Sequence, residues 1–234
     1  MFRDQTVVIL FSGGQDSTTC LFKVLAEGAK RVYALTISYG QRHDIEVEAA
    51  RRVLQTARTW YTAQIDHEEL DLGAVFQSQS PLVAGGQIPT LDQPAPANGV
   101  QPTFVEGRNL LFLTLAANRA AAIGADAIVT GVCETDGGGY PDCRRAFVDS
   151  VERTLALAFV GKETWLPIYT PLMHLNKADT VYLAASLPGA FTGLRHSHTC
   201  YAGQSPPCGE CHACVLRARG FTEAGIPDPL LRTV

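Results

Sequence analysis

Hydrophobic and polar positions along the chain alternate between two patterns. Short continuous apolar runs are typical of strands buried on both faces of a parallel sheet, and apolar residues at helical spacing indicate amphipathic helices. Strands are predicted at 7–11, 31–37, 62–66, 127–131 and 165–168. Helices are predicted at 17–25, 45–54, 109–123, 147–160 and 177–187. This order predicts right-handed βαβ units, and therefore an α/β fold with a doubly wound parallel sheet.

Two segments break this rhythm. Residues 77–103 hold five of the thirteen prolines and show no periodicity, so they are predicted to form a long loop. Such a loop is either a lid over a substrate or a passive insertion. From Thr199 onward the chain is rich in Cys, Gly and Pro, and periodicity predicts no element. We therefore expect an α/β domain at residues 1–195 and a small C-terminal segment at residues 196–234.

Composition and charge narrow the class of protein. Hydrophobic residues make up 46% and charged residues 18%, as in globular proteins. A net charge of -4 offers no general field for a polyanion, so we expect no stable nucleic-acid partner, although a local basic patch stays open. The most apolar long segment contains Asn118, Arg119 and Asp126, which a bilayer would penalise. We find no signal-peptide pattern, and we expect a cytoplasmic protein without a membrane partner.

A glycine-rich turn lies between the first predicted strand and the first predicted helix. Backbone N–H groups and the helix dipole converge at such a point and favour an anion. Gly13 and Gly14 lack a Cβ and let the backbone approach a phosphate, while Ser12 and Ser17 can add hydroxyl donors. Asp16 could hold a magnesium ion that neutralises the phosphates. The turn lacks the lysine of a Walker A loop, and a tight turn with a capping serine is the alternative.

Four cysteines crowd the C-terminal segment at the spacing C-x7-C-x2-C-x2-C. They are Cys200, Cys208, Cys211 and Cys214. In a reducing compartment such a cluster is more often a metal site than a disulfide framework. Four thiolates suit a closed tetrahedral zinc site, and the nearby histidines are interpreted as bystanders or outer-shell groups. Two disulfides or an iron–sulfur cluster remain the alternatives.

The pattern SGGxDS resembles the pyrophosphate loop of the N-type ATP pyrophosphatases, which cleave ATP between the α- and β-phosphates. Further motifs narrow the resemblance to the 7-cyano-7-deazaguanine synthase family. In order they are FSGGQDSTTCL (11–21), YGQRH (39–43), GRNLLFLTLAA (107–117), TGVCETD (130–136), GYPDCR (139–144), TPLMHLNKADT (170–180) and CGECHACVLRARG (208–220). The resemblance runs from Val7 to Leu216 and implies a Rossmann-like fold.

The resemblance also implies a function. Such a family member is a ligase that forms C–N bonds and converts 7-carboxy-7-deazaguanine and ammonia to 7-cyano-7-deazaguanine, for queuosine precursor biosynthesis. The acid is adenylated, ammonia displaces AMP to give the amide, and a second adenylation leads to the nitrile. ATP, magnesium (Mg) and zinc (Zn) are the expected cofactors. Free ammonia and a homodimer are also expected.

Residue roles follow from the matching motifs. The nucleotide-binding candidates are Phe11, Ser12, Gly13, Gly14, Gln15, Asp16, Ser17, Thr18, Thr19, Cys20 and Leu21. The catalytic candidates are Asp16, Ser17, Arg108 and Lys177. Lys177 is expected to make a second phosphate contact, with a solvated lysine at a helix start as the alternative. The substrate-binding candidates are Arg108, Asn109, Glu134, Asp136, Tyr140, Asp142 and Arg144.

A guanidinium fork matches a carboxylate, so Arg108 and Asn109 could bind the substrate carboxylate or the nucleotide. A carboxylate accepts well from the N–H and the amine of the deazaguanine edge, and the three acidic candidates are not ranked. Arg42 and His43 follow a strand end and could also contact a ligand.

Two departures from the family pattern concern the substrate. Gly137-Gly138 stands where the family carries Phe-Ser, and Arg145 stands where it carries an acid. The first change removes an aromatic surface that could stack on the base. Cys133 is interpreted as a small buried residue, with a catalytic thiol as the alternative. The competing functions are an amide ligase or tRNA thiolation enzyme of the same superfamily, and a zinc-ribbon nucleic-acid-binding protein.

Overall fold

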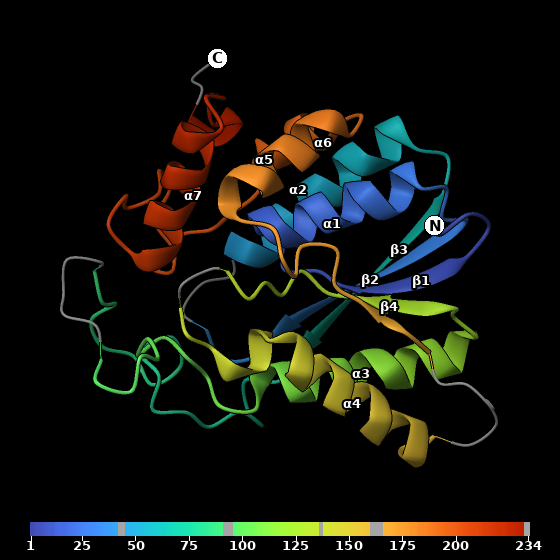
Figure 1. Ribbon diagram of the computed structural model, residues 1–234, viewed down its shortest axis with the longest axis horizontal. Coiled ribbons are helices and arrows are strands. Elements are labelled where there is room, and N and C mark those ends of the chain that lie inside the picture. The colour runs from blue at the N-terminus through green and yellow to red at the C-terminus, as the bar shows by residue number, and fades with distance from the viewer. Residues whose placement is uncertain (42–44, 91–95, 136–137, 160–165, 232–234) are drawn as a thin grey trace.

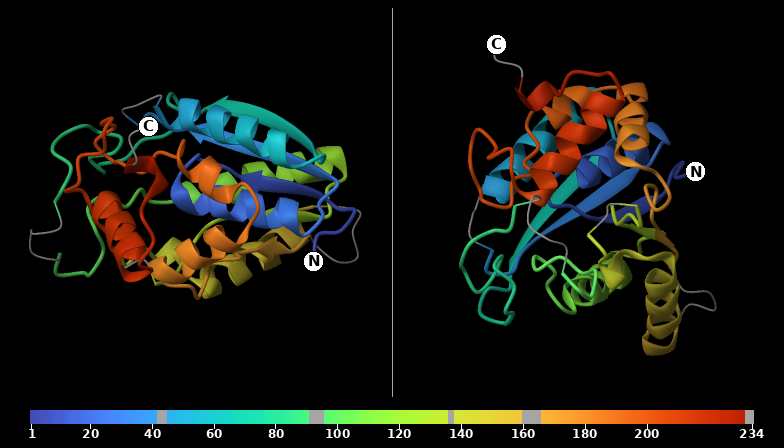
Figure 2. Two further views of the ribbon diagram at one scale, coloured as in Figure 1. Left: turned by 90° about the horizontal axis from the view of Figure 1, so that it is seen from above. Right: turned by 60° about the vertical axis from the view of Figure 1, so that its left-hand side comes forward.

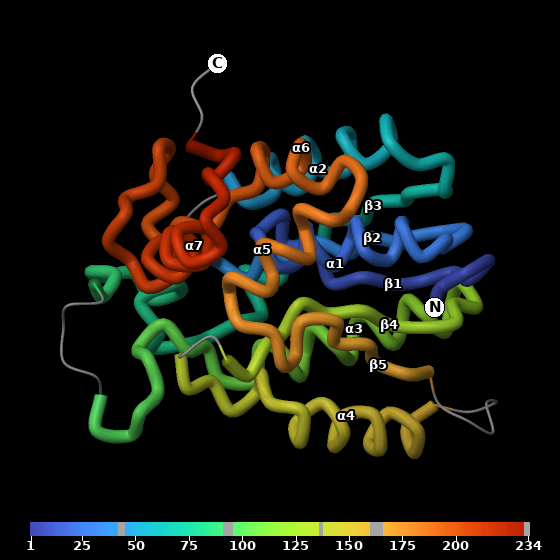
Figure 3. The backbone as a smooth tube through the Cα atoms, turned by 45° about the horizontal axis from the view of Figure 1, so that its top comes forward, coloured from blue at the N-terminus to red at the C-terminus, as the bar shows by residue number. Residues whose placement is uncertain are grey.

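The computed structural model describes residues 1–41, 45–90, 96–135, 138–159 and 166–231. Its centre is a parallel sheet with the strand order β3-β2-β1-β4-β5 (Figure 3). The strands are β1 (Thr6–Leu10), β2 (Arg31–Ser38), β3 (Gln64–Asp71), β4 (Ala127–Val129) and β5 (Ile168–Tyr169). The order grows outward from β1 in both directions, which confirms the doubly wound α/β fold.

Helices cover both faces of the sheet (Figure 1). On one face lie α1 (Gln15–Ala26), α2 (Ile45–Trp60), α5 (Lys177–Ser186) and α6 (Ala190–Leu194). On the other face lie α3 (Arg108–Ile123) and α4 (Arg145–Ala158), and α7 (His212–Glu223) packs beside α5 near one end of the sheet. Two short 3-10 turns complete the elements, η1 (Pro141–Cys143) and η2 (Pro229–Leu231).

The central strands explain this layering because their side chains alternate between two cores. Val7 and Ile9 of β1 pack with α1 and α2, whereas Val8 between them packs with α3 and α4. All three side chains are fully buried. A strand that is apolar at every position therefore needs a layer of helices on each side, as the continuous apolar runs of the sequence predict.

The polar edge strand β3 differs from the prediction. It runs to Asp71, whereas the hydrophobic pattern places its end at Asp66. The added residues are tolerated because β3 pairs only with β2 and stays partly exposed. Glu68 is held by Arg119 at 2.9 Å, and Glu69 by Arg51 at 2.6 Å. Ion pairs to the flanking helices thus replace apolar burial at this edge.

The described parts of the predicted loop, residues 77–90 and 96–103, contain no helix or strand. They contain one isolated bridge, between Thr90 and Cys211 in the C-terminal segment. Figure 2 shows the loop and that segment on the same side of the molecule. The C-terminal segment also reaches the main core, where Phe221 and Ala224 pack with α1 and α5 residues. The domain boundary between residues 195 and 196 stays a prediction.

Helices α6 and α7 were not predicted from the hydrophobic pattern, and residue 165, the predicted start of β5, lies outside the described residues. In the part of the chain that the structure describes, no helix is both long and apolar enough to cross a membrane.

Candidate active site

A cavity of about 360 Å³ lies at the carboxyl ends of the central strands. Phe11 follows β1, Ile37 belongs to the end of β2, and Thr130 follows β4, and all three line the cavity. The strand order reverses between β1 and β4, and in open α/β sheets ligands bind outside the carboxyl ends of the strands at such a point. The fold therefore places the phosphate loop where a ligand is expected.

The loop between β1 and α1 is fixed by its own hydrogen bonds and by its neighbours. The Ser12 hydroxyl lies 3.2 Å from the Ser17 hydroxyl, and Ser17 Oγ donates to the Gly14 carbonyl at 3.3 Å. Gly13 has a φ of +76°, and a Cβ on it would lie 2.5 Å from the backbone nitrogen of Ala50 in α2. Glycine is therefore required at this position for the close approach of α2 as well as for the turn.

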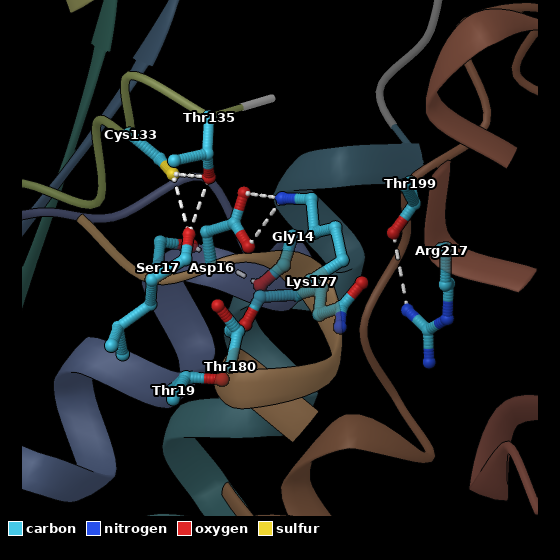
Figure 4. Close-up of polar contacts among 12 residues, drawn as sticks. Gly14, Asp16, Ser17, Thr19, Cys133, Thr135, Lys177, Thr180, Thr199 and Arg217 are labelled. Carbon is cyan, nitrogen blue, oxygen red and sulfur yellow. Dashed lines mark hydrogen bonds and ion pairs between the residues drawn. The ribbon is translucent and has the colours of Figure 1, made fainter. Parts of the chain in front are cut away.

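Lys177 and Asp16 meet beside this loop (Figure 4). Lys177 Nζ lies 2.9 Å from Oδ1 and 2.7 Å from Oδ2 of Asp16, although the two residues are 161 positions apart. Lys177 begins α5, and a capping box of Asn176 and Asp179 fixes that helix start. Asp16, the candidate magnesium ligand, and Lys177, the candidate phosphate-binding residue, thus form an ion pair in which each neutralises the charge of the other.

Arg108 and Glu46 bring opposite charges to another part of the cavity lining. Arg108 Nη1 donates to the Tyr39 hydroxyl at 3.0 Å, and its guanidinium lies 5.4 Å from the centre of the Tyr39 ring. Burial raises the pKa of Glu46 from 4.5 to about 7, and the positive charge of Arg108 offsets part of that rise.

The structure brings most of the substrate-binding candidates together. The cavity is lined by Arg108, Asn109, Glu134, Tyr140 and Arg144. Asp142 is buried and is not among the described residues that line the cavity; burial raises the pKa of its carboxyl. Glu134 accepts a hydrogen bond from the backbone N–H of Arg145 at 2.5 Å, at the start of α4. Asp136, Arg42, His43 and Gly137 lie outside the described residues.

The nucleotide-binding candidates divide into two groups. Those that line the cavity are Phe11, Ser12, Gly14, Gln15, Asp16 and Ser17. Those that lie in α1 behind the loop, with buried side chains, are Thr18, Thr19, Cys20 and Leu21. Gly13 shapes the turn. The second group therefore supports the loop from the interior.

Two further predictions concern single residues. Cys133 is buried, as expected, and its thiol contacts the Leu175 carbonyl oxygen at 3.1 Å and the Thr135 hydroxyl at 3.0 Å (Figure 4). Arg145, the basic residue at a position where the family pattern has an acid, pairs with Asp149 in its own helix at 2.7 Å. Its guanidinium also lies 3.5 Å from Glu152 of the same helix and donates to the Thr170 hydroxyl at 3.1 Å.

Several residues that line the cavity escaped the sequence analysis. They are Tyr39, Glu46, His198, Tyr201 and His212. The motif YGQRH pointed toward Tyr39, and the histidines were interpreted as bystanders of the cysteines. Glu46 falls within the helix predicted at 45–54 and was not singled out.

The four C-terminal cysteines converge, and their donor set fits a metal. All four sulfurs lie within 4.8 Å of one another, and none of them is joined in a disulfide. The sulfurs of Cys208 and Cys214 are 3.9 Å apart, close to the roughly 3.8 Å that tetrahedral zinc–thiolate bonds impose. The N–H groups of Cys208 and Cys211 each donate to a cluster sulfur at 3.4 Å. Such donors favour thiolates.

The loop 77–103 connects this cysteine cluster to the cavity wall. Ile88 packs against the cluster and also against the group of Tyr39, Leu82 and Val105. At the other end of the loop, the Thr103 hydroxyl lies 2.6 Å from the Tyr140 hydroxyl. None of the described residues of the loop lines the large cavity. The described part of the loop therefore packs behind Tyr39 and Tyr140, the aromatic residues of the cavity lining that it contacts.

Comparisons with known proteins agree with this picture. The family model described as "Queuosine biosynthesis protein QueC" matches residues 6–225. The chain is 48% identical over 227 residues to the 7-cyano-7-deazaguanine synthase of Gloeobacter violaceus, covering 95% of this chain and 94% of that protein. It is 44% identical over 235 residues to the same enzyme of Chromobacterium violaceum, covering 97% and 94%.

One solved structure also matches, the U34-tRNA thiolase NcsA from Methanococcus maripaludis with its 4Fe-4S cluster. The match covers 95% of this chain and 68% of that chain at 13% identity, with a TM-score of 0.46. That likeness is too distant to bear on chemistry. The family model and the two sequence relatives, by contrast, span nearly the whole chain, and the chain belongs to the QueC family of queuosine biosynthesis proteins.

Proposed function

We propose that this chain is a 7-cyano-7-deazaguanine synthase, which converts 7-carboxy-7-deazaguanine and ammonia to the nitrile with ATP. One observation carries the proposal: the phosphate loop and the Asp16–Lys177 pair lie in the cavity at the switch point of a QueC-family chain. The reaction must activate a carboxyl group and then an amide, and both activations release pyrophosphate. A single site for pyrophosphate can serve both steps.

The loop residues have distinct parts in this proposal. The N–H groups at the start of α1 and the Ser12 and Ser17 hydroxyls bind the phosphates that leave. Asp16 would hold magnesium, which neutralises charge on those phosphates. With Asp16 committed to that ion, Lys177, which contacts Asp16 in the structure, would be available to bind the phosphates. Arg108 and Arg144 hold oxygens of the deazaguanine substrate.

The chemistry balances over two adenylations. In the first, a carboxylate oxygen attacks the α-phosphorus and pyrophosphate leaves; ammonia then displaces AMP and loses a proton, which gives the amide. In the second, the amide oxygen attacks the α-phosphorus, pyrophosphate leaves again and the nitrogen loses one proton; AMP then departs as the nitrogen loses its second proton, and the nitrile remains. Two AMP are released for each nitrile. Positioning within the cavity accounts for most of the enzyme's contribution.

The cysteine cluster is proposed to bind zinc in a structural role. Four protein ligands leave no open position for a substrate, so the metal stabilises the C-terminal segment. Elemental analysis of protein purified without chelator should find one zinc per chain, and iron in its place would contradict this part. The predicted homodimer and the cytoplasmic location stay predictions.

The decisive experiment supplies ATP, ammonium and 7-carboxy-7-deazaguanine to the purified protein and identifies the products by mass spectrometry. The nitrile with two AMP supports the proposal, whereas amide alone with one AMP would indicate a simple amide ligase. Asp16→Ala should abolish AMP release. Cys133→Ala should keep activity, because ammonia is the nucleophile and the thiol contacts a carbonyl oxygen. Loss of activity in that variant would favour a sulfur-transfer mechanism.

A further inference from the structure

Three acidic side chains line the described part of the cavity, and two of them are already held. Asp16 is paired with Lys177, and Glu134 accepts the backbone N–H of Arg145. Glu46 is different, because no described residue donates a hydrogen bond to its carboxyl group. A partly buried carboxyl without a donor costs free energy in the absence of ligand. Such a group is expected where a ligand supplies the donors.

The position of Glu46 is fixed by the fold. It lies in the first turn of α2, and the backbone of that turn packs against Gly13 of the phosphate loop. Ala49, Ala50 and Val53 are buried on the same face of the helix, since they follow Glu46 by three, four and seven positions. The side chain therefore points inward, to the cavity that Arg108 also lines.

We propose that Glu46 reads the base of the substrate, by accepting the ring N–H and the exocyclic amine of the deazaguanine edge with its two carboxylate oxygens. The inference rests on the proposed function and names a residue that determines specificity. Arg108, whose charge acts on Glu46, supplies the donor for the neighbouring ring carbonyl. Acid and guanidinium together present acceptors beside a donor, which complements the guanine-type edge.

The chemistry of the edge separates this role from recognition of ATP. Adenine presents an amine donor beside a ring nitrogen that only accepts, so an ionised carboxylate gains one hydrogen bond from it. The deazaguanine edge presents two adjacent donors and gains two. The raised pKa of Glu46 agrees with a carboxyl that awaits donors, because donors would favour its charged form. Among the acidic candidates, Asp142 does not line the cavity and Glu134 already accepts a backbone N–H.

The test compares two substrates: 7-carboxy-7-deazaguanine and the analogue that lacks the exocyclic amine, 7-carboxy-7-deazahypoxanthine. The unaltered enzyme should prefer the first by roughly 10- to 100-fold in kcat/KM, because the analogue leaves part of the carboxylate unpaired. In Glu46→Ala this preference should fall to near one. The KM for 7-carboxy-7-deazaguanine should rise while the KM for ATP stays unchanged. The substrate preference of Glu46→Gln should lie between those of the unaltered enzyme and Glu46→Ala.

Controls come from two other acids of the chain. Glu48→Gln changes an exposed acid of the same helix, which pairs with Arg52, and should keep the full preference. Glu134→Gln tests the other candidate reader. If Glu46→Ala keeps the preference, or if its ATP KM rises in place of the base KM, the inference is wrong. Metal content and far-UV circular dichroism verify that each variant is folded.

A failure of the inference can be told apart from a failure of the proposed function. Equilibrium dialysis of the two bases against the protein measures recognition without turnover. If the unaltered protein makes no nitrile but binds the amine-bearing base better, and Glu46→Ala loses that difference, only the reaction assignment fails. If nitrile forms at normal rates and Glu46→Ala still discriminates, only the role of Glu46 fails.

Discussion

Replacing Glu46 with glutamine should stabilise the ligand-free protein above neutral pH. Burial raises the pKa of Glu46 from 4.5 to about 7. As pH rises from 4.5 to 7, the unfolded chain releases this proton while the folded chain keeps it, so the free energy of unfolding falls. The rise corresponds to at most about 3 kcal/mol, and contact with solvent reduces the expected loss to about 1–3 kcal/mol. Glutamine has no charge to bury and escapes this loss.

The assay is urea or thermal unfolding of metal-replete, nucleotide-free protein at several pH values. Glu46→Gln and the unaltered chain should be nearly equal at pH about 5 and should diverge as pH rises. Above the folded-state pKa the variant should melt about 2–12 °C higher, since each kcal/mol shifts Tm by about 2–4 °C at this chain length. Arg108 stays charged throughout, and burial raises the pKa of Tyr39, so neither neighbour titrates in this range.

A difference that stays constant with pH would refute the reasoning. A lower melting temperature for Glu46→Gln than for the unaltered chain would instead mean that ionised Glu46 stabilises the fold. An ionised glutamate in the first turn stabilises a helix by a few tenths of a kcal/mol through the helix dipole, so its loss would lower the melting temperature. Glu48→Gln provides that comparison, because Glu48 lies in the same turn but is exposed.

Three further predictions follow from the packing around the site. Gly13→Ala should lower the melting temperature and abolish AMP release, because the new Cβ would meet the backbone of α2; unchanged activity would contradict the close approach. Asp228→Ala should cost about 3–5 kcal/mol in urea unfolding, because it leaves the buried Arg217 without its bidentate partner at 2.6 and 2.8 Å. Glu223→Ala, which removes the exposed ion-pair partner of Arg219, should change the free energy of unfolding little. Chelating the metal should expose the loop 77–103 and the C-terminal segment to proteolysis while the α/β core resists, and simultaneous cleavage throughout would show that the cluster supports the whole fold.

The central elements could be predicted from the sequence because local patterns decide them. Fully buried strands such as β1 read as continuous apolar runs, and the phosphate loop is one short contiguous motif. The full length of edge strand β3 was not predicted, since Glu68 and Glu69 are compensated by Arg119 of α3 and Arg51 of α2, and a local pattern does not show these ion pairs. Helix α7 was missed for another reason. The helix begins after Cys211, which is its N-cap and belongs to the cysteine cluster. Hydrophobic periodicity does not indicate such a start.

The sequence supplied candidates for part of the described cavity lining, but it did not predict the contacts between them. Asp16 and Lys177 were both singled out, yet the contact between them joins positions 161 apart and depends on how α5 packs against α1. Glu46 could have been found. It falls three and four positions before Ala49 and Ala50, on the apolar face of an amphipathic helix, where an acid does not contribute to packing. An acidic residue that breaks the period of a buried face is therefore a signal for a functional site.

Asp16 and Glu46, two of the three acids that line the described part of the cavity, differ in what a ligand must do on binding. Asp16 is paired with Lys177 in the ligand-free protein, so under the proposed function nucleotide and magnesium would replace an existing ion pair, and the loss of that pair would reduce the binding free energy. Glu46 has no such partner among the residues that the structure describes, and under the inference above a base that brings two donors would relieve its unfavourable burial. The site is thus preorganised to accept the base without rearrangement, whereas the pyrophosphate end must exchange partners. This asymmetry suits a reaction in which the base stays bound through two successive adenylations while nucleotides enter and leave at the loop.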